Sequence, residues 1–205
     1  MRPSQFHHRT AGPALFVSPK CRAAIRIFNP LLRYALQQAS LEPDVLAIRK
    51  SSDLLGPQIP LKGVVIERVD AMFFLTVCEN RPSRSNTELS QLIRALAANG
   101  LRLLERDASD IKAEPLFSNA REVWSHQRYS VTIRDRLKIA AVLHEEGPQT
   151  IIELEERVRP ACDLLNGICA LACEDRVVLN IEDVPLGPNT IVVGRQTATY
   201  LRPAG

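Results

Sequence analysis

The stretch 63–105 constrains the fold most, because strand-forming and helix-forming patterns alternate within it. Two runs rich in Val, Ile and Phe, at 63–68 and 72–80, predict strands joined as a hairpin. Apolar residues at helical spacing predict a helix at about 87–99 that ends in an Asn-Gly pair, and a strand follows at 101–105. A strand, a helix and a further strand in this order form a βαβ-like crossover, so we expect an α/β fold with a mixed sheet flanked by helices.

The residues around this stretch divide the chain into three expected parts. Residues 1–18 lack periodicity and are expected to be a flexible basic lead. Residues 19–130 form the α/β domain, which begins with a helix over 21–38, interrupted at Pro30, and a strand at 44–50. The loops expected in this domain include 56–60, which holds two prolines and a glycine.

Residues 131–205 predict a small winged helix-turn-helix domain. Its three helices are expected at 133–147, 148–158 and 160–174, and a β-hairpin follows at 177–181 and 190–195. The first helix is expected to face inward through Ile133, Leu137, Ala140 and Ala141. The second has Thr150 as its N-cap and Glu153 three residues later, which is a capping box.

Charge is distributed unevenly between the two domains. Residues 1–130 hold 18 Lys and Arg and 12 Asp and Glu, a net charge of +6, whereas residues 131–205 hold 8 and 11, a net charge of −3. No acidic residue precedes Glu42. A basic surface of this kind binds phosphates, so DNA is an expected partner. The candidate DNA-binding residues are Arg22, Arg26, Arg33, Arg84, Arg121 and Arg128.

Two further features bound the cellular context. No apolar run approaches the roughly 20 residues that a membrane-spanning helix needs, so we expect a cytoplasmic protein with no membrane partner. The five cysteines have no disulfide-type framework, which suits a reducing compartment. Three of them, Cys162, Cys169 and Cys173, share a helical face; without a fourth ligand at suitable spacing, we interpret them as core residues rather than a metal site.

Two segments are similar to TnsA-like heteromeric transposase endonuclease subunits. The first is "LIRALAANGLRLLERDASDIKAEPLFSNAREVW", and the second comprises "GPQTIIEL" and "ALACEDRVVLNIEDVPLGPNT". The resemblance implies a restriction-endonuclease-like α/β core followed by a winged helix. It also implies a subunit that cuts the 5′ ends of a transposon beside an integrase-type transposase and contacts an ATPase regulator through its C-terminal domain.

The residues that would perform this chemistry are incomplete. The family pattern places a Glu on an early helix, an Asp on one hairpin strand and Glu/Gln-x-Lys on the next, to hold Mg²⁺ and position water. The segment 21–38 contains no acid, and Gly63, Val64 and Val65 stand where the Asp is expected. Of the pattern only Glu79 is clear, and it is followed by Arg81, a poor substitute for a water-positioning lysine.

The remaining carboxylates are weaker candidates. Asp70 and Glu79 are expected to flank one uninterrupted strand, which separates them by roughly 30 Å and prevents a shared metal. Glu67 lies nearer but beside the hairpin turn. We therefore treat Glu79, Arg81, Glu67 and Asp70 as remnants of a catalytic site, with Glu79 as the metal ligand if the site is active.

Three hypotheses remain open from the sequence. The first is a non-catalytic TnsA-like subunit without cofactor, which holds DNA through its basic domain and a transposase- or ATPase-type protein through its acidic winged helix. The second is an active Mg²⁺-dependent endonuclease. The third is a winged-helix transcriptional regulator. In the expected third helix of the C-terminal domain, only Asn166 and the terminal Arg176 suit base contacts, and both have acidic neighbours. This favours docking of a protein.

Overall fold

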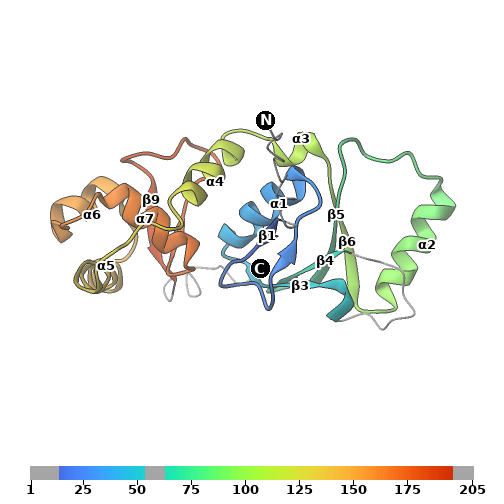
Figure 1. The fold of residues 1–205 in the computed structure, drawn as a ribbon, viewed down its shortest axis with the longest axis horizontal. Helices are drawn as coiled ribbons and strands as arrows, with labels where there is room; N and C mark the ends of the chain where they lie inside the picture. Colours follow the sequence, from blue (N-terminus) through green and yellow to red (C-terminus); the bar gives the residue numbers. More distant parts are fainter. Residues whose placement is uncertain (1–13, 54–62, 196–205) are drawn as a thin grey trace, which may run out of the picture.

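A four-stranded mixed sheet forms one half of the molecule (Figure 1). The computed structural model describes residues 14–53 and 63–195. The strands are β3 (Val45–Lys50), β4 (Val64–Arg68), β5 (Met72–Val77) and β6 (Leu101–Arg106), and they lie in this order across the sheet. The β3–β4 and β4–β5 pairs are antiparallel, and the β5–β6 pair is parallel. The predicted mixed sheet with its hairpin is confirmed.

Helix α2 (Asn86–Ala97) is the crossover between β5 and β6. Ser85 caps the helix and forms a capping box with Glu88. The helix therefore begins at Asn86, one residue before the predicted start. Gly100 adopts the left-handed backbone expected after the helix (φ 69°). A small cluster of Val65, Phe74, Leu96 and Leu101 joins α2 to one face of the sheet.

Helix α1 (Pro30–Leu41) covers the opposite face of the sheet, and its start corrects the sequence-based prediction. Pro30 does not interrupt a helix over 21–38. It occupies the first turn, where its missing N–H has no intrahelical partner to lose, and Asn29 caps the helix by accepting from the Leu32 N–H. The residues before it form two short antiparallel strands, β1 (Leu15–Phe16) and β2 (Ile25–Arg26).

The C-terminal third of the described chain is a separate arrangement of three helices and three short strands. In chain order these are α5 (Ile133–Glu145), β7 (Gln149–Thr150), α6 (Ile151–Val158), α7 (Leu164–Cys173), β8 (Val177–Leu179) and β9 (Ile191–Gly194). The strands form an antiparallel sheet in the order β7-β9-β8. The predicted capping box of Thr150 and Glu153 is confirmed at the start of α6.

Helix α4 (Leu116–Ser125) connects the two halves, because it packs against α1 on one side and α7 on the other. It follows the short helix α3 (Ala108–Ile111), and its buried residues include Val123 and Trp124. The Trp124 Nε1–H donates to the Gln37 carbonyl at 3.1 Å, and its ring lies 5.1 Å from that of Phe16. The main hydrophobic core continues from the sheet through α4 to α7. A domain boundary at residue 130 therefore stays a prediction.

Helix α5 faces the other way from the prediction. Its buried residues are Asp135, Ile139 and Leu143, whereas Ile133 and Leu137 are 77% and 67% exposed. The helix carries apolar residues on two faces, and its packing against α6 and β9 decides which of them is buried. The buried Asp135 accepts a hydrogen bond from the Thr132 hydroxyl at 2.9 Å, which stabilises the start of the helix.

Some expectations concern parts of the chain outside this description. The loop at 56–60 and most of the expected lead lie there, although Leu15 and Phe16 within that lead form β1. Within the described residues, 14–53 and 63–195, no helix is long and apolar enough to cross a membrane.

Candidate functional site

The β4–β5 hairpin is the place where a metal-dependent nuclease of the expected type would carry its carboxylates. Its four cross-strand pairs are Val64–Leu75, Val65–Phe74, Ile66–Phe73 and Glu67–Met72. Only one of these eight side chains is a carboxylate, and its partner is a thioether. Two carboxylates on neighbouring strands, which could share a metal ion, do not occur in these pairs.

The two predicted acids near the hairpin turn are each paired with an arginine. Glu67 forms an ion pair with Arg49 on the neighbouring strand β3. Asp70 lies in the exposed turn between β4 and β5, where its carboxylate is 3.7 Å from Arg102. Strand β5 runs uninterrupted between Asp70 and Glu79, so the predicted separation of these two acids at opposite ends of one strand is confirmed.

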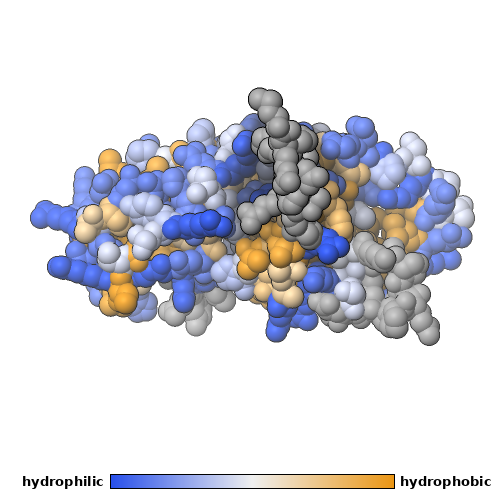
Figure 2. All heavy atoms as spheres, in the orientation of Figure 1, coloured by the Kyte–Doolittle hydropathy of each residue, from blue (hydrophilic) through white to orange (hydrophobic). Residues whose placement is uncertain are grey.

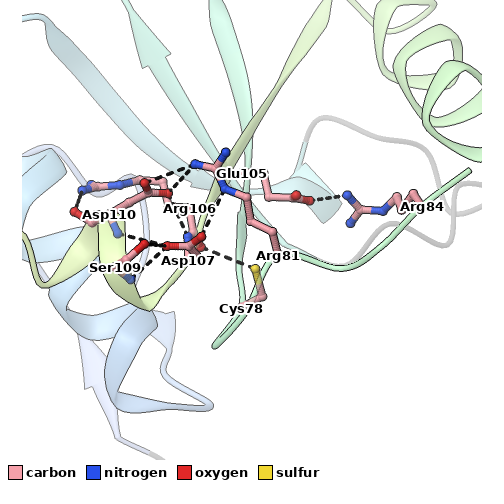
Figure 3. A network of polar contacts seen from close by, with 8 residues as sticks. All are labelled: Cys78, Arg81, Arg84, Glu105, Arg106, Asp107, Ser109 and Asp110. Carbon is pink, nitrogen blue, oxygen red and sulfur yellow. Dashed lines mark hydrogen bonds and ion pairs between the residues drawn. The ribbon is translucent and has the colours of Figure 1, made fainter. Parts of the chain in front are cut away.

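Glu79 and Arg81 lie just beyond the carboxyl end of β5, beside the end of β6. The Glu79 side chain is exposed, and its carbonyl accepts from the Ala108 N–H at 3.3 Å. Arg81 reaches between two carboxylates: its Nε lies 3.1 Å from Asp107 and its Nη2 lies 2.9 Å from Asp110 (Figure 3). The residue in the position of the expected lysine is therefore held by two acids and does not pair with Glu79.

The carboxylates of this cluster are held in their ionised form. The Ser109 hydroxyl and the backbone N–H groups of α3 lower the pKa of Asp107, and the Arg81 guanidinium lowers the pKa of Asp110. Glu105 on β6 pairs separately with Arg84 (Figure 3). Each of these three carboxylates is already paired with an arginine, so a metal ion would have to displace an arginine or open the first turn of α3.

A pocket of about 490 Å³ opens on the other side of the hairpin, where α1, β4 and β5 meet. Four apolar side chains from these three elements line it: Leu32, Val64, Leu75 and Val77. Among the residues whose side chains the structure describes, the charged ones that line it are Arg26 and Lys50.

The six candidate DNA-binding arginines differ in whether the fold already engages their side chains. Arg84 is engaged by Glu105, and Arg121 lies 5.4 Å over the Phe117 ring and 5.8 Å over the Tyr34 ring. The other four are exposed and form no ion pair within the described ranges: Arg22, Arg26, Arg33 and Arg128. Arg22 and Arg26 lie close in sequence around β2, beside the pocket, and Arg33 lies in the first turns of α1.

Helix α7 is buried, and the loop that follows β8 is anchored to α4 at three backbone groups. Eight of the ten residues of α7 are buried, and the helix packs against α4, α6 and α1. Asn119 of α4 donates to the carbonyls of Ile181 and Val184, both at 2.8 Å, and accepts from the Leu186 N–H at 2.9 Å. These contacts hold the loop 180–190 against α4. The buried faces of α7 are therefore not free to enter a DNA groove.

Two of the three cysteines that were expected to share a helical face are core residues of α7, as predicted, whereas Cys162 lies outside the helix. Cys169 and Cys173 are buried on α7, and burial raises the pKa of both thiols to about 12. Cys162 precedes the helix and is partly exposed. Among the described residues, no group of three or more His, Cys, Asp or Glu side chains could hold a metal ion.

Two important polar residues were missed by sequence reasoning. Asn119 lies inside α4, where an amide among buried apolar neighbours is a usable indication of a specific role. Lys20 is only 5% exposed; it donates to the Glu42 carbonyl and lies 3.5 Å from Asp175. Nothing near Lys20 in the sequence indicates burial, because its partners come from α1 and from the turn after α7.

Comparisons with known families and known proteins add no assignment. No family model matches the chain, and no curated protein matches it.

Proposed function

We propose that this chain is a non-catalytic, TnsA-like subunit of a DNA transposition or mobile-element system. It holds DNA through its basic N-terminal half and a protein of the transposase or ATPase type through its acidic C-terminal unit, a winged helix. The observation that carries the proposal is the pocket at α1, β4 and β5, where Leu32, Val64 and Leu75 come from the three elements that would supply the metal ligands.

The chain path supports the same architecture. A helix, three antiparallel strands, a crossover helix and a parallel fourth strand follow one another from α1 to β6, as expected of a restriction-endonuclease-like core. The C-terminal unit has the helix and strand order of a winged helix, with β7 paired at the edge of the β8–β9 hairpin.

The proposed lack of nuclease activity rests on the residues that occupy the expected metal and lysine positions. The lining side chains that the structure describes include no carboxylate, and carboxylates are the protein ligands by which Mg²⁺ is usually held. Arg81, permanently protonated and bound by Asp107 and Asp110, cannot take the part of a water-positioning lysine. We therefore expect no Mg²⁺-dependent nicking of supercoiled plasmid DNA by the full chain. Nicking that disappears in Glu79→Ala would establish the active endonuclease instead.

The proposed DNA contact is tested by salt-dependent binding to duplex DNA. The logarithm of the binding constant falls with the logarithm of the salt concentration, and each phosphate that is no longer neutralised makes this slope less steep by about 0.9. Arg22→Ala/Arg26→Ala should therefore reduce the magnitude of the slope by about 2. The matched control is Arg94→Ala/Arg102→Ala, which removes the same charge from exposed positions on α2 and β6 and should leave the slope unchanged. If both variants reduced the magnitude of the slope equally, a local DNA site would be contradicted.

The buried state of α7 supports a protein partner over base reading by the C-terminal unit. A recognition helix needs a free polar face, and α7 has eight buried residues of ten. We therefore expect the full chain to bind unrelated duplexes with affinities within about threefold of one another, since phosphate contacts carry no sequence information. Selection of one sequence from a random pool, unaffected by Arg22→Ala/Arg26→Ala, would favour the transcriptional regulator.

A further inference from the structure

The outward face of α5 carries apolar residues that the fold does not cover. Ile133 and Leu137 are the two most exposed large hydrophobics of the C-terminal unit, and Ala140 and Ala141 continue the same face towards His144. These five residues are called the α5 face. In Figure 2 a group of hydrophobic side chains lies at the lower left, over α5, surrounded by hydrophilic residues.

The apolar surface continues beyond the helix itself. Leu137 and Ala140 also line a groove of about 420 Å³ between α5 and the β8–β9 hairpin. An exposed apolar strip beside a groove is typical of a surface that another chain covers. The question is which chain.

The charges beside the α5 face would complement those of a second copy of the same helix. Arg134 and Glu145 lie on the same flank of the helix, near its two ends, about 16 Å apart along the axis. Neither makes an ion pair or hydrogen bond with the described part of the chain. If a second copy of α5 lies antiparallel to the first, the two-fold axis places Arg134 of each copy at the height of Glu145 of the other, on the same side.

The sizes of the apolar side chains fit the same arrangement. A two-fold axis that brings Arg134 to Glu145 passes close to position 139, beside Ala140. Each Leu137 then meets Ala140 and Ala141 of the other copy, so a large side chain lies over two small ones, and the helix axes approach closely. A two-fold interface of this kind needs one surface that complements itself.

We propose that two copies of this chain associate through an antiparallel pair of α5 helices. One helix face buries less than the roughly 800 Å² per partner of a typical stable interface, so the association is weak. It is independent of DNA binding and of the proposed transposition role, because none of the residues of the α5 face belongs to the candidate DNA-binding set.

Sedimentation equilibrium of the full chain from about 5 to 500 μM, a range suited to a small interface, measures the association. We expect a monomer–dimer equilibrium whose dissociation constant increases at least about tenfold in Leu137→Glu, because a charge then enters the apolar contact. The matched control is Ile152→Glu on α6, which is 46% exposed and lies outside the α5 face. This variant should associate like the original chain.

A charge exchange tests the antiparallel geometry. Arg134→Glu and Glu145→Arg should each weaken the dimer, because like charges then meet across the interface. The double variant R134E/E145R should restore it to within about threefold, since both pairs are re-formed with opposite polarity. Both exchanges suit the helix macrodipole, and an unchanged circular-dichroism melting curve checks that the fold is retained.

Three results would overturn the proposal. The first is a chain that stays monomeric over the whole concentration range, which would leave the α5 face to a different protein. The second is a dimer that is insensitive to Leu137→Glu. The third is a double variant that is no better than the single exchanges, which would exclude the pairing of Arg134 with Glu145.

Discussion

At the carboxyl ends of β5 and β6, the exposed Arg81 pairs with Asp107 and Asp110, whereas on α4 the buried Asn119 anchors the backbone of the loop 180–190. The first cluster has full charges, and the second has one neutral amide. Charged pairs in water gain little, because solvent and salt screen them and ordering the side chains costs entropy. Buried amide contacts are costly to remove, since their partners then lack any hydrogen bond. Burial should therefore decide which region stabilises the fold more.

The largest expected effect is at Asn119. Asn119→Ala removes three hydrogen bonds at a side chain that is only 4% exposed and leaves backbone groups of the loop without partners. We expect the free energy of unfolding to fall by about 3 kcal/mol, measured by urea denaturation. Ser118→Ala, on the neighbouring exposed position of α4, is the control and should change it by less than about 1 kcal/mol. Equal effects would remove the distinction between the two regions.

Lys20 provides the next test, because it is a full charge placed in the buried region. Burial lowers its pKa from 10.5 to about 8, although Asp175 favours the charged form. Between these two values the unfolded chain keeps a proton that the folded chain has lost, so stability increases as pH rises through this window. Below pH 8 both states are charged and the contribution is constant.

The expected rise between pH 8 and pH 10 is at most about 3 kcal/mol. It is measured as the difference between the unfolding free energies of the original chain and Lys20→Met over that range, which removes the contribution of other titrating groups. A difference that does not change with pH would mean that the Lys20 ammonium is as well solvated in the folded chain as in the unfolded one.

The smallest effect is expected at the exposed cluster. Arg81→Ala breaks two ion pairs whose arginine is 61% exposed, and the free energy of unfolding should fall by less than about 1 kcal/mol. The effect should shrink further in about 0.5 M salt, because screening shortens the range of exposed charges. A decrease of about 2 kcal/mol or more in denaturant unfolding would show that this cluster stabilises the fold as strongly as Asn119 does.

The local parts of this fold could be predicted from the sequence, and the reasons differ between elements. The strands around residues 64–106 and the capping box of Thr150 and Glu153 depend on neighbouring residues, so their patterns are sufficient. Pro30 was misplaced because a proline suits both an interruption and the first turn of a helix. Only the cap from Asn29 decides between them.

The orientation of α5 could not be predicted, because its sequence has apolar residues on two faces. Whether Ile139 or Leu137 lies inward depends on packing against α6 and β9. Both elements follow α5 in the chain, and β9 is distant from it in sequence, so the pattern within α5 cannot decide between the two faces. The same limit applies to the candidate site. The sequence shows that Gly63–Val65 lack the expected carboxylate. It does not show the pocket that Leu32, Val64 and Val77 line together, because these residues are far apart in the chain.

The place of α4 in a continuous core has a mechanical consequence. Val123 and Trp124 lie in the main hydrophobic core, and α4 packs against both α1 and α7. A hinge motion between the two halves would have to separate these packed surfaces. We therefore expect the two halves to move together as one rigid unit. A second copy bound on α5, as proposed, would then be held at a fixed distance and rotation from the sheet.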